Sequence, residues 1–123
     1  MSDIQEKIDA YTSQCNGSDK LWIWWLNGKS RKFFYTDGVK LVSETCGAYW
    51  LIDTILLNQR LPEAKAEEFQ VWKLAVVDSS GILTCEDGNG RQTVYQFIPF
   101  TDFPIPEMTF WFEIDALMLP CER

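Results

Sequence analysis

The chain of 123 residues contains no histidine, and this absence excludes a large part of enzyme chemistry. Without an imidazole, no Ser-His or Cys-His nucleophile pair can form, and no metal site can use a histidine ligand. The GxSxG, P-loop, GxGxxG and HExxH motifs are also absent. Any enzyme built on this sequence would have to use carboxylates, lysine, tyrosine or an activated cysteine.

Long apolar segments are absent as well. The longest run, from Leu21 to Leu26, is far shorter than the roughly 18 to 20 residues that span a bilayer. The first residues, MSDIQEKIDAY, mix acids with lysine and contain no apolar stretch typical of a signal peptide. We therefore expect a soluble, cytoplasmic protein that does not contact a membrane.

Four cysteines are spaced too widely to suggest a metal site. Cys15, Cys46, Cys85 and Cys121 are 31, 39 and 36 residues apart, so no CxxC pair is present. Because no export signal is visible, we expect all four to be reduced thiols that are buried or half-buried. The sequence predicts no metal and no cofactor.

Charge is distributed unevenly along the chain. The formal net charge is −7; residues 1–60 hold seven Lys/Arg and seven Asp/Glu, whereas residues 61–123 hold four and eleven. Phosphate binding depends on clustered positive charge, so free duplex nucleic acid is an unfavourable ligand for the acidic half. A partner protein with a basic surface would suit this half better.

The start of the chain predicts a helix followed by an aromatic hairpin. Apolar residues at helical spacing favour a short amphipathic helix over residues 3–14. Asn27-Gly28 then separates two aromatic-rich runs, which predicts a β-hairpin with strands over 21–26 and 31–36. Both faces of the first strand are apolar, so the strand is either covered on both sides or exposes an aromatic face.

Two further helices are expected after the hairpin. The first begins at a cap formed by Thr36 or Asp37 and ends at Gly47. The second, over residues 48–59, is apolar almost all round, which predicts that it is largely buried. Asp53 would then lie among apolar neighbours, where it needs a hydrogen-bonding partner or a raised pKa.

The second half of the sequence is rich in β-forming residues. After a polar segment at 61–68 that predicts one helical turn, short β-rich runs occupy residues 69–77, 81–86, 91–100 and 108–115. In the last run, Phe110, Phe112 and Ile114 predict a core face, and they alternate with residues that face largely solvent or a partner: Thr109, Trp111, Glu113 and Asp115. The pattern predicts one α+β domain over residues 1–123. It has an antiparallel sheet, made of a meander plus the aromatic hairpin, with two or three helices on one face.

Aromatic residues on the strands are candidates for contact with a partner. One interpretation is that the rings fill the core while neighbouring Lys and Arg protect an edge hairpin from aggregation. The other is that rings remain exposed, either for a homodimer contact through the hairpin or Trp111, or for stacking of a nucleotide or sugar. The candidate partner-binding residues are Trp22, Trp24, Trp111, Glu113 and Asp115.

Carboxylates are the second group of candidates. The stretch EDGNGR at 86–91 resembles the start of an EF-hand loop, but Gln92 and Ile98 stand where glycine and glutamate are required. A hairpin turn explains this stretch better. No spacing fixes a catalytic pair of acids, and the sequence identifies no catalytic residue. The candidate polar-site residues are Asp37, Asp53, Glu86, Asp87 and Asp102.

One combination of motifs resembles a known family. The strings YTDGVK (35–40), GAYWLID (47–53), FQVW (69–72), CEDGNG (85–90) and TDFP (101–104) occur in this order. This order is similar to that of a family of small bacterial, phage and plasmid proteins with no assigned activity, cofactor or catalytic residue. The resemblance covers about residues 30 to 120. It implies, by analogy alone, an accessory role on mobile elements, such as interference with host defence.

These observations lead to one main functional hypothesis and two alternatives. We expect a non-enzymatic protein that binds a partner protein, whose acidic half mimics nucleic acid and occupies a basic groove on a host or defence protein. A small hydrolase that uses carboxylates or a metal is the first alternative. A stacking site for nucleotides or sugars on the aromatic hairpin is the second.

Overall fold

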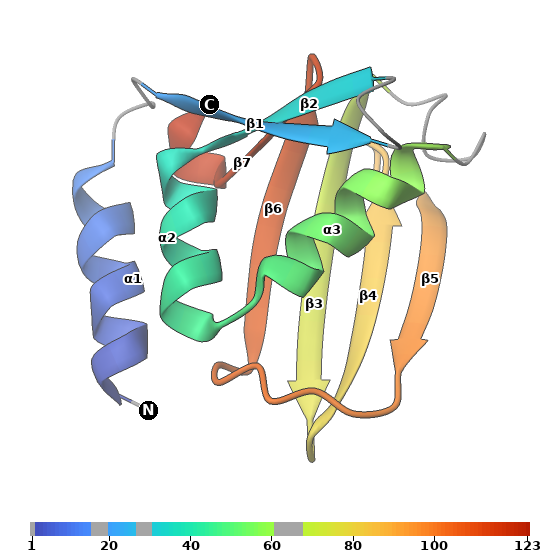
Figure 1. Cartoon of the computed structure of the whole chain (residues 1–123). Coiled ribbons are helices and arrows are strands. Elements are labelled where there is room, and N and C mark those ends of the chain that lie inside the picture. Colours follow the sequence, from blue (N-terminus) through green and yellow to red (C-terminus); the bar gives the residue numbers. More distant parts are fainter. Residues whose placement is uncertain (1, 16–19, 27–30, 61–67) are drawn as a thin grey trace.

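The structure is a computed structural model that describes residues 2–15, 20–26, 31–60 and 68–123. Within these ranges the chain forms helices and strands in the order shown in Figure 1. The helices are α1 (Ser2–Gln14), α2 (Asp37–Cys46) and α3 (Tyr49–Leu57), with 3-10 turns η1 (Asn58–Arg60) and η2 (Pro120–Glu122). The strands are β1 (Leu21–Leu26), β2 (Arg31–Thr36), β3 (Phe69–Val77), β4 (Ser80–Glu86), β5 (Gln92–Ile98), β6 (Glu107–Glu113) and β7 (Ala116–Met118).

The strands form a single seven-stranded sheet with the order β1-β2-β7-β6-β3-β4-β5. Neighbouring strands are antiparallel except for β2 and β7, which are parallel. The sheet twists strongly, so that the β1-β2 hairpin crosses over the ends of β6, β3 and β4 in Figure 1. The predicted α+β class is therefore confirmed.

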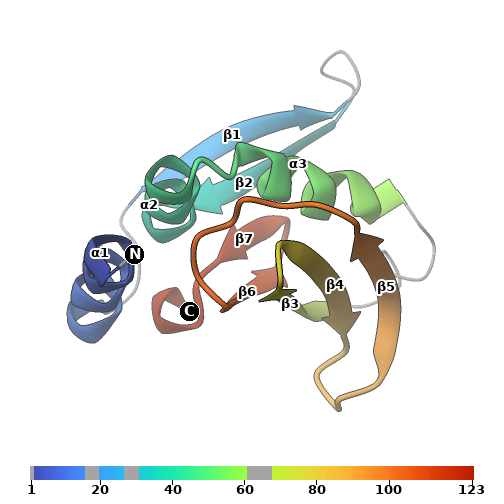
Figure 2. The ribbon, with the colours of Figure 1, turned by 90° about the horizontal axis from the view of Figure 1, so that it is seen from below.

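The helices and the sheet enclose one core. Figure 2 shows the sheet curving around α2 and α3, while α1 lies outside them next to α2. Alternate residues of the strands point inward, and Trp72, Leu83, Phe110 and Leu117 are almost completely buried. The opposite side of the sheet carries no helix among the described residues.

The second half departs from a simple meander. Strands β3, β4 and β5 follow one another in the sheet, but β6 pairs with β3 and not with β5. Residues 99–106 carry the chain across the end of the sheet to make this connection, on the near side in Figure 2. The meander therefore contains three strands, whereas the sequence predicts four. The pairing of β6 with β3 was not predicted, because strands that are distant in the sequence leave no local pattern.

The last predicted strand is also interrupted. Ile114 and Asp115 form a tight turn with φ angles of 52° and 60°, as in the type I′ turns that suit hairpins. Ile114 is consequently 87% exposed, and its predicted place in the core is wrong. After this turn, β7 pairs with both β6 and β2. Its parallel pairing with β2 joins the N-terminal hairpin to the strands of the second half in one sheet.

Local signals explain the ends of α2. Thr36 is the N-cap, and its hydroxyl accepts a hydrogen bond from the backbone nitrogen of Val39. Of the two predicted caps, Thr36 is therefore the one that is used. Gly47 ends the helix with a left-handed φ of 62°, as predicted.

A buried polar cluster ties the end of α3 to the sheet. The side-chain amides of Gln59 and Gln70 exchange two hydrogen bonds of 2.9 Å. The indole nitrogen of Trp72 donates to Gln70 Oε1 at 2.8 Å. Because these groups satisfy one another, the cluster fixes the position of α3 without leaving a buried polar group unpaired.

Two local predictions lie outside the described residues: the Asn27-Gly28 turn and the helical turn in the polar segment after Pro62. In the part of the chain that the structure describes, no helix has the length and apolar character that crossing a membrane requires.

Candidate functional site

Two tryptophans of β1 each donate a hydrogen bond to an aspartate on a helix. Trp22 Nε1 lies 2.9 Å from Asp37 Oδ1 at the start of α2, and Trp24 Nε1 lies 2.8 Å from Asp53 Oδ1 on α3. The alternation of the strand turns both rings toward the helices, where they are half-buried. The structure thus joins, in pairs, residues that the sequence assigns to separate candidate sites.

The position of Asp53 corrects the prediction of its burial. The side chain is exposed on α3, so its predicted burial among apolar neighbours is wrong. The helix still covers the core, because Leu51, Ile52, Ile55 and Leu56 are buried on its inner side. Asp37 likewise binds the indole of Trp22, while Thr36 caps α2.

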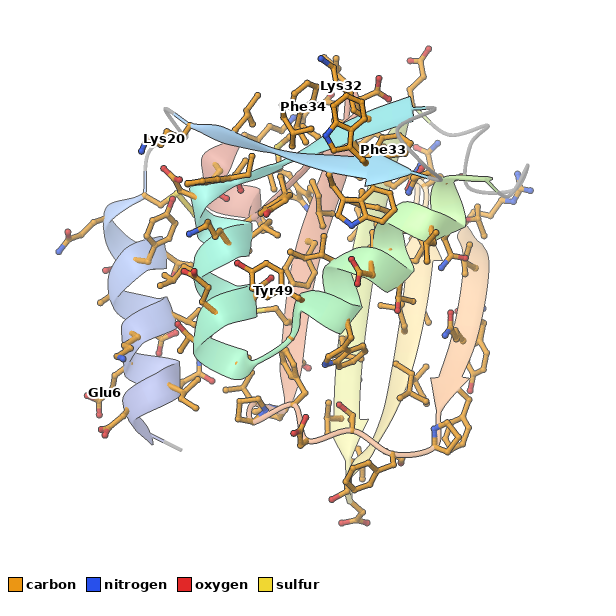
Figure 3. All side chains as sticks on the ribbon, in the orientation of Figure 1. Glu6, Lys20, Lys32, Phe33, Phe34 and Tyr49 are labelled. Atoms are coloured by element: carbon orange, nitrogen blue, oxygen red, sulfur yellow. A yellow bond between two sulfur atoms is a disulfide. The ribbon has the colours of Figure 1, made fainter. Side chains whose placement is uncertain are left out.

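A lysine and two tyrosines accompany these pairs. Lys40 Nζ lies 4.4 Å from the centre of the Trp22 ring and 3.1 Å from Glu44 Oε2. The hydrogen bond to Glu44 raises the pKa of Lys40. Partial burial raises the pKa of the Tyr35 hydroxyl, and the neighbouring Tyr49 adds to this rise. Tyr49 lies where α2 passes into α3, as labelled in Figure 3.

We call this region the Trp–Asp surface and define it by Trp22, Trp24, Asp37, Lys40, Tyr49 and Asp53. It combines ring faces that attract cations with carboxylates whose remaining lone pairs can accept further hydrogen bonds. The contact between Lys40 and Trp22 is a cation–π interaction within the chain itself. The chemistry of the surface therefore suits a ligand that carries ammonium or guanidinium groups.

A second group of acids gathers at one end of the sheet. In the strand register, Glu113 lies opposite Phe69 and Glu86 lies opposite Val71, near the start of β3. Asp87 and Asp115 lie in the turns that follow Glu86 and Glu113. We call Glu86, Asp87, Glu113 and Asp115 the acidic end.

Several charges at the acidic end are already compensated. Glu113 forms a two-pronged hydrogen bond with Arg123, whose guanidinium also covers the rings of Phe69 and Trp111. Glu86 lies 3.5 Å from Lys73. The predicted partner-binding residue Trp111 is thus half-buried beneath Arg123.

Asp87 is mainly a turn residue. Its Oδ1 accepts hydrogen bonds from the backbone nitrogens of Asn89 and Arg91, at 2.8 and 2.9 Å. The hydrogen bond from Arg91 has the largest effect and that from Asn89 the next largest, and both lower the pKa of the Asp87 carboxyl. The predicted hairpin turn is confirmed, and Gly90 has the positive φ of 87° that such a turn uses.

Asp102 lies at the opposite end of the strands from the candidate acids Glu86 and Asp87. It lines an open pocket of about 240 Å³ together with Trp50, Ile98, Phe100 and Thr101. Because antiparallel strands separate the turn after β4 from the loop after β5, Asp102 cannot combine with Glu86 and Asp87 in one site. Among the described residues, no group of three or more His, Cys, Asp or Glu is placed to hold a metal ion.

The most fully bonded carboxylate, Glu122, is one that sequence analysis missed. Its Oε1 accepts hydrogen bonds from Thr36 Oγ1 and from the backbone nitrogen of Leu119, and its Oε2 accepts from Tyr11 Oη and from the backbone nitrogen of Gly38. The side chain is buried, at 6% exposed. A carboxylate at the N-terminus of α2 is favoured by the free amides and the dipole there.

Gly38 makes this arrangement possible. A Cβ at this position would lie 2.5 Å from Glu122 Oε1 and 2.8 Å from Leu119 Cδ1. The glycine of the YTDGVK string therefore leaves room for a side chain from the far end of the sequence. A glycine in the first turn of a helix was the one local hint of a close approach here.

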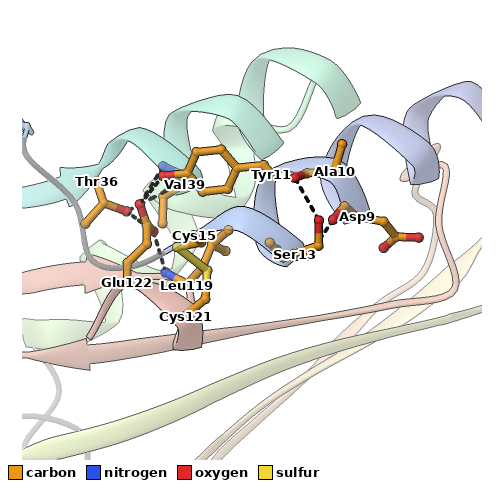
Figure 4. The surroundings of a disulfide bond; sticks show 12 residues. Asp9, Ala10, Tyr11, Ser13, Cys15, Thr36, Val39, Leu119, Cys121 and Glu122 are labelled. Carbon is orange, nitrogen blue, oxygen red and sulfur yellow. Dashed lines mark hydrogen bonds between the residues drawn. A yellow bond between two sulfur atoms is a disulfide. The ribbon is translucent and has the colours of Figure 1, made fainter.

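The cysteines differ from the expectation in one respect. Cys15 and Cys121 form a disulfide, with their Cα atoms 5.7 Å apart, beside the Glu122 cluster (Figure 4). The prediction of reduced thiols is therefore wrong for this pair. Cys46 and Cys85 are buried thiols, as expected. Burial raises the pKa of Cys46 to about 11, so its reactive thiolate is scarce at neutral pH.

Comparison with known proteins identifies the family and nothing further. The family model described as a family of unknown function, DUF6876, matches residues 6–123. No curated protein and no solved structure matches the chain. The chain belongs to the DUF6876 family.

Proposed function

We propose that this DUF6876 protein is a non-enzymatic interaction protein that binds a basic segment of a partner protein at the Trp–Asp surface. The observation that carries the proposal is the pairing of Trp22 with Asp37 and of Trp24 with Asp53. Each indole orients a carboxylate next to an aromatic ring. This arrangement suits lysine and arginine, because their cationic groups can contact an aromatic ring face and a carboxylate at the same time.

The exposure of the surface supports this use. Asp53 is exposed and Tyr49 is 42% exposed, so both are open to a ligand without any rearrangement of the helices. Asp53 belongs to none of the ion pairs of the described residues. A basic segment would supply the positive charge that this carboxylate lacks.

The test is a fluorescence titration with a synthetic peptide of alternating arginine and glycine, which serves as the probe. We expect the emission of Trp22 and Trp24 to change on binding, and affinity to fall between low and physiological salt. Asp53→Asn should weaken binding about tenfold, because a hydrogen bond to an exposed charged group contributes about 1.5 kcal/mol, the low end of its usual range. Asp102→Asn, an exposed acid at the far end of the strands, is the matched control.

Two results would contradict the proposal. One is a titration that is insensitive to salt, and the other is equal binding by Asp53→Asn and the unsubstituted chain. A glutamate-glycine peptide of the same length controls for binding that depends on the rings alone.

The acidic end supports a second candidate, the mimicry of nucleic acid. The sheet brings Glu86, Asp87, Glu113 and Asp115 to one end, which offers a basic groove several charges at once. Compensation of Glu113 by Arg123 and of Glu86 by Lys73 weakens this candidate relative to the first. If mimicry is correct, Glu113→Gln combined with Asp115→Asn will abolish peptide binding while Asp53→Asn will not.

The remaining expectations are proposals of the same kind. An accessory role on phages or plasmids rests on the family resemblance, and a cytoplasmic location rests on the sequence. Disulfides are rare in the cytoplasm, so counting the free thiols of the protein as isolated from its cell tests that location against the Cys15–Cys121 bond. A hydrolase that uses carboxylates has weaker support, because Asp37 and Asp53 each bind an indole rather than each other.

A further inference from the structure

Strand β1 forms an open edge of the sheet. It pairs with β2 over its whole length, without a bulge, and no described strand pairs with its other side. Its outer face, which points away from the helices, carries Leu21, Ile23 and Trp25 at 55%, 49% and 46% exposure. Phe34 of β2 continues this face, as Figure 3 shows.

The opposite edge of the sheet is protected in ways that β1 is not. The pairing of β5 with β4 shifts register between Cys85 and Glu86, and Pro99 follows directly after β5. Exposed glutamines at 92 and 96 also make this strand more polar. Bulges, prolines and polar residues are the usual means of preventing edge pairing, whereas a straight apolar edge favours it.

We propose that two copies of this chain pair through β1 in an antiparallel arrangement, with a two-fold axis at Ile23. The two-fold axis runs perpendicular to the sheet, so the outer faces of both copies lie on the same side. In this arrangement, outer-face residues of one copy pair with outer-face residues of the other. Centring the pair on Ile23 sets Leu21 opposite Trp25 of the partner subunit. The three outer residues of each copy then form one continuous apolar stripe.

A second copy fits this edge better than another partner. Strand β1 of a second copy, running antiparallel, can pair with the outer backbone groups of β1 in the first copy. The two copies then form a closed dimer that needs no other strand or helix. Lys32 of β2 lies beside the stripe, with its Nζ 5.9 Å from the centre of the Trp25 ring and 5.6 Å from that of the Phe34 ring. This positive charge disfavours a basic segment of a partner protein at the stripe.

The dimer is independent of the proposed function. Trp22 and Trp24 point to the inner face of the same strand, so pairing through β1 leaves both Trp–Asp pairs intact. One strand and three side chains per copy make a small interface, toward the lower limit of specific contacts. We therefore expect a reversible dimer whose population depends on protein concentration.

The test is the mass of the full chain in solution, measured by analytical ultracentrifugation from about 1 µM to about 1 mM, a range suited to a small interface. We expect the mass to rise from 14.3 kDa toward twice this value. Ile23→Lys should keep the chain monomeric, because two ammonium groups would face each other across the axis. Phe97→Lys, at a similarly exposed position on the outer face of β5, should dimerise like the unsubstituted chain.

A mass of 14.3 kDa at every concentration would overturn the proposal, as would dissociation by Phe97→Lys but not by Ile23→Lys. Cross-linking supplies a second readout that needs no destabilising charge. Ile23→Cys should form an intermolecular disulfide on mild oxidation, since paired residues of neighbouring strands bring their Cβ atoms within about 5.5 Å. Phe97→Cys is its control, and equal cross-linking of both variants would contradict the pairing at Ile23.

Discussion

Glu122 lies against the start of α2 and Asp53 lies on α3, and the surroundings of these two acids differ completely. Glu122 is buried, and donors of the protein occupy both of its oxygens. Asp53 is exposed and accepts an indole hydrogen bond from Trp24. The difference separates a carboxylate that holds the fold together from one that remains available to a ligand. The number of protein donors around an acid, together with its burial, therefore indicates its role.

The largest effect should come from removing the charge of Glu122. Glu122→Gln places an NH₂ group against two of the four donors, so both lose their acceptor. Each buried donor left without an acceptor costs about 1 to 3 kcal/mol, and we expect the free energy of unfolding to fall by about 3 to 5 kcal/mol. Urea unfolding followed by circular dichroism measures the change. Glu113→Gln is the control, and a loss below about 0.5 kcal/mol for Glu122→Gln would contradict the structural role.

The second effect concerns the disulfide beside Glu122. Replacing Cys15 and Cys121 together by serine removes a link across 106 residues of sequence. Disulfides typically contribute about 2 to 4 kcal/mol, chiefly by restricting the unfolded chain, and we expect a loss of this size. The same unfolding measurement applies, with and without a reductant. Equal stability of the oxidised chain and the double variant would show that the bond adds nothing to the fold.

Asp53→Asn should have the smallest effect on stability. The amide oxygen of the new side chain could still accept the hydrogen bond of Trp24, and the position is exposed. The free energy of unfolding should therefore change by less than about 0.5 kcal/mol. Peptide binding should nevertheless fall, as proposed above. A loss of stability similar to that of Glu122→Gln would remove the distinction between the two acids and make Asp53 a structural residue.

Sequence analysis predicts the local elements of this protein well and their long-range partners poorly. The two strands of the hairpin, the Gly47 break and the β4-β5 turn follow from alternation and turn residues, and the structure confirms them. Strand β7 is only three residues long and follows a turn of Ile114 and Asp115, so no periodicity marks it. Its parallel pairing with β2 depends on residues about 80 positions apart, which no local pattern encodes.

The candidate site shows the same limit. The residues Trp22, Trp24, Asp37 and Asp53 could be identified by type, but each pair joins two elements of the fold. The exposure of Asp53 was not predictable, because Tyr49 and Trp50 make α3 apolar almost all round. Glu122 belongs to no motif, and its role depends on donors from α1, β2 and α2. Such contacts become visible only when the chain is folded.

The Cys15–Cys121 bond has one more consequence, for the covalent continuity of the molecule. It closes nearly the whole chain into a ring, since all strands and the helices α2 and α3 lie between the two cysteines. A protease that cuts any single loop in this ring opens it without releasing a piece. The two fragments would separate on a gel only after reduction, so a nicked molecule can keep every contact of the intact one.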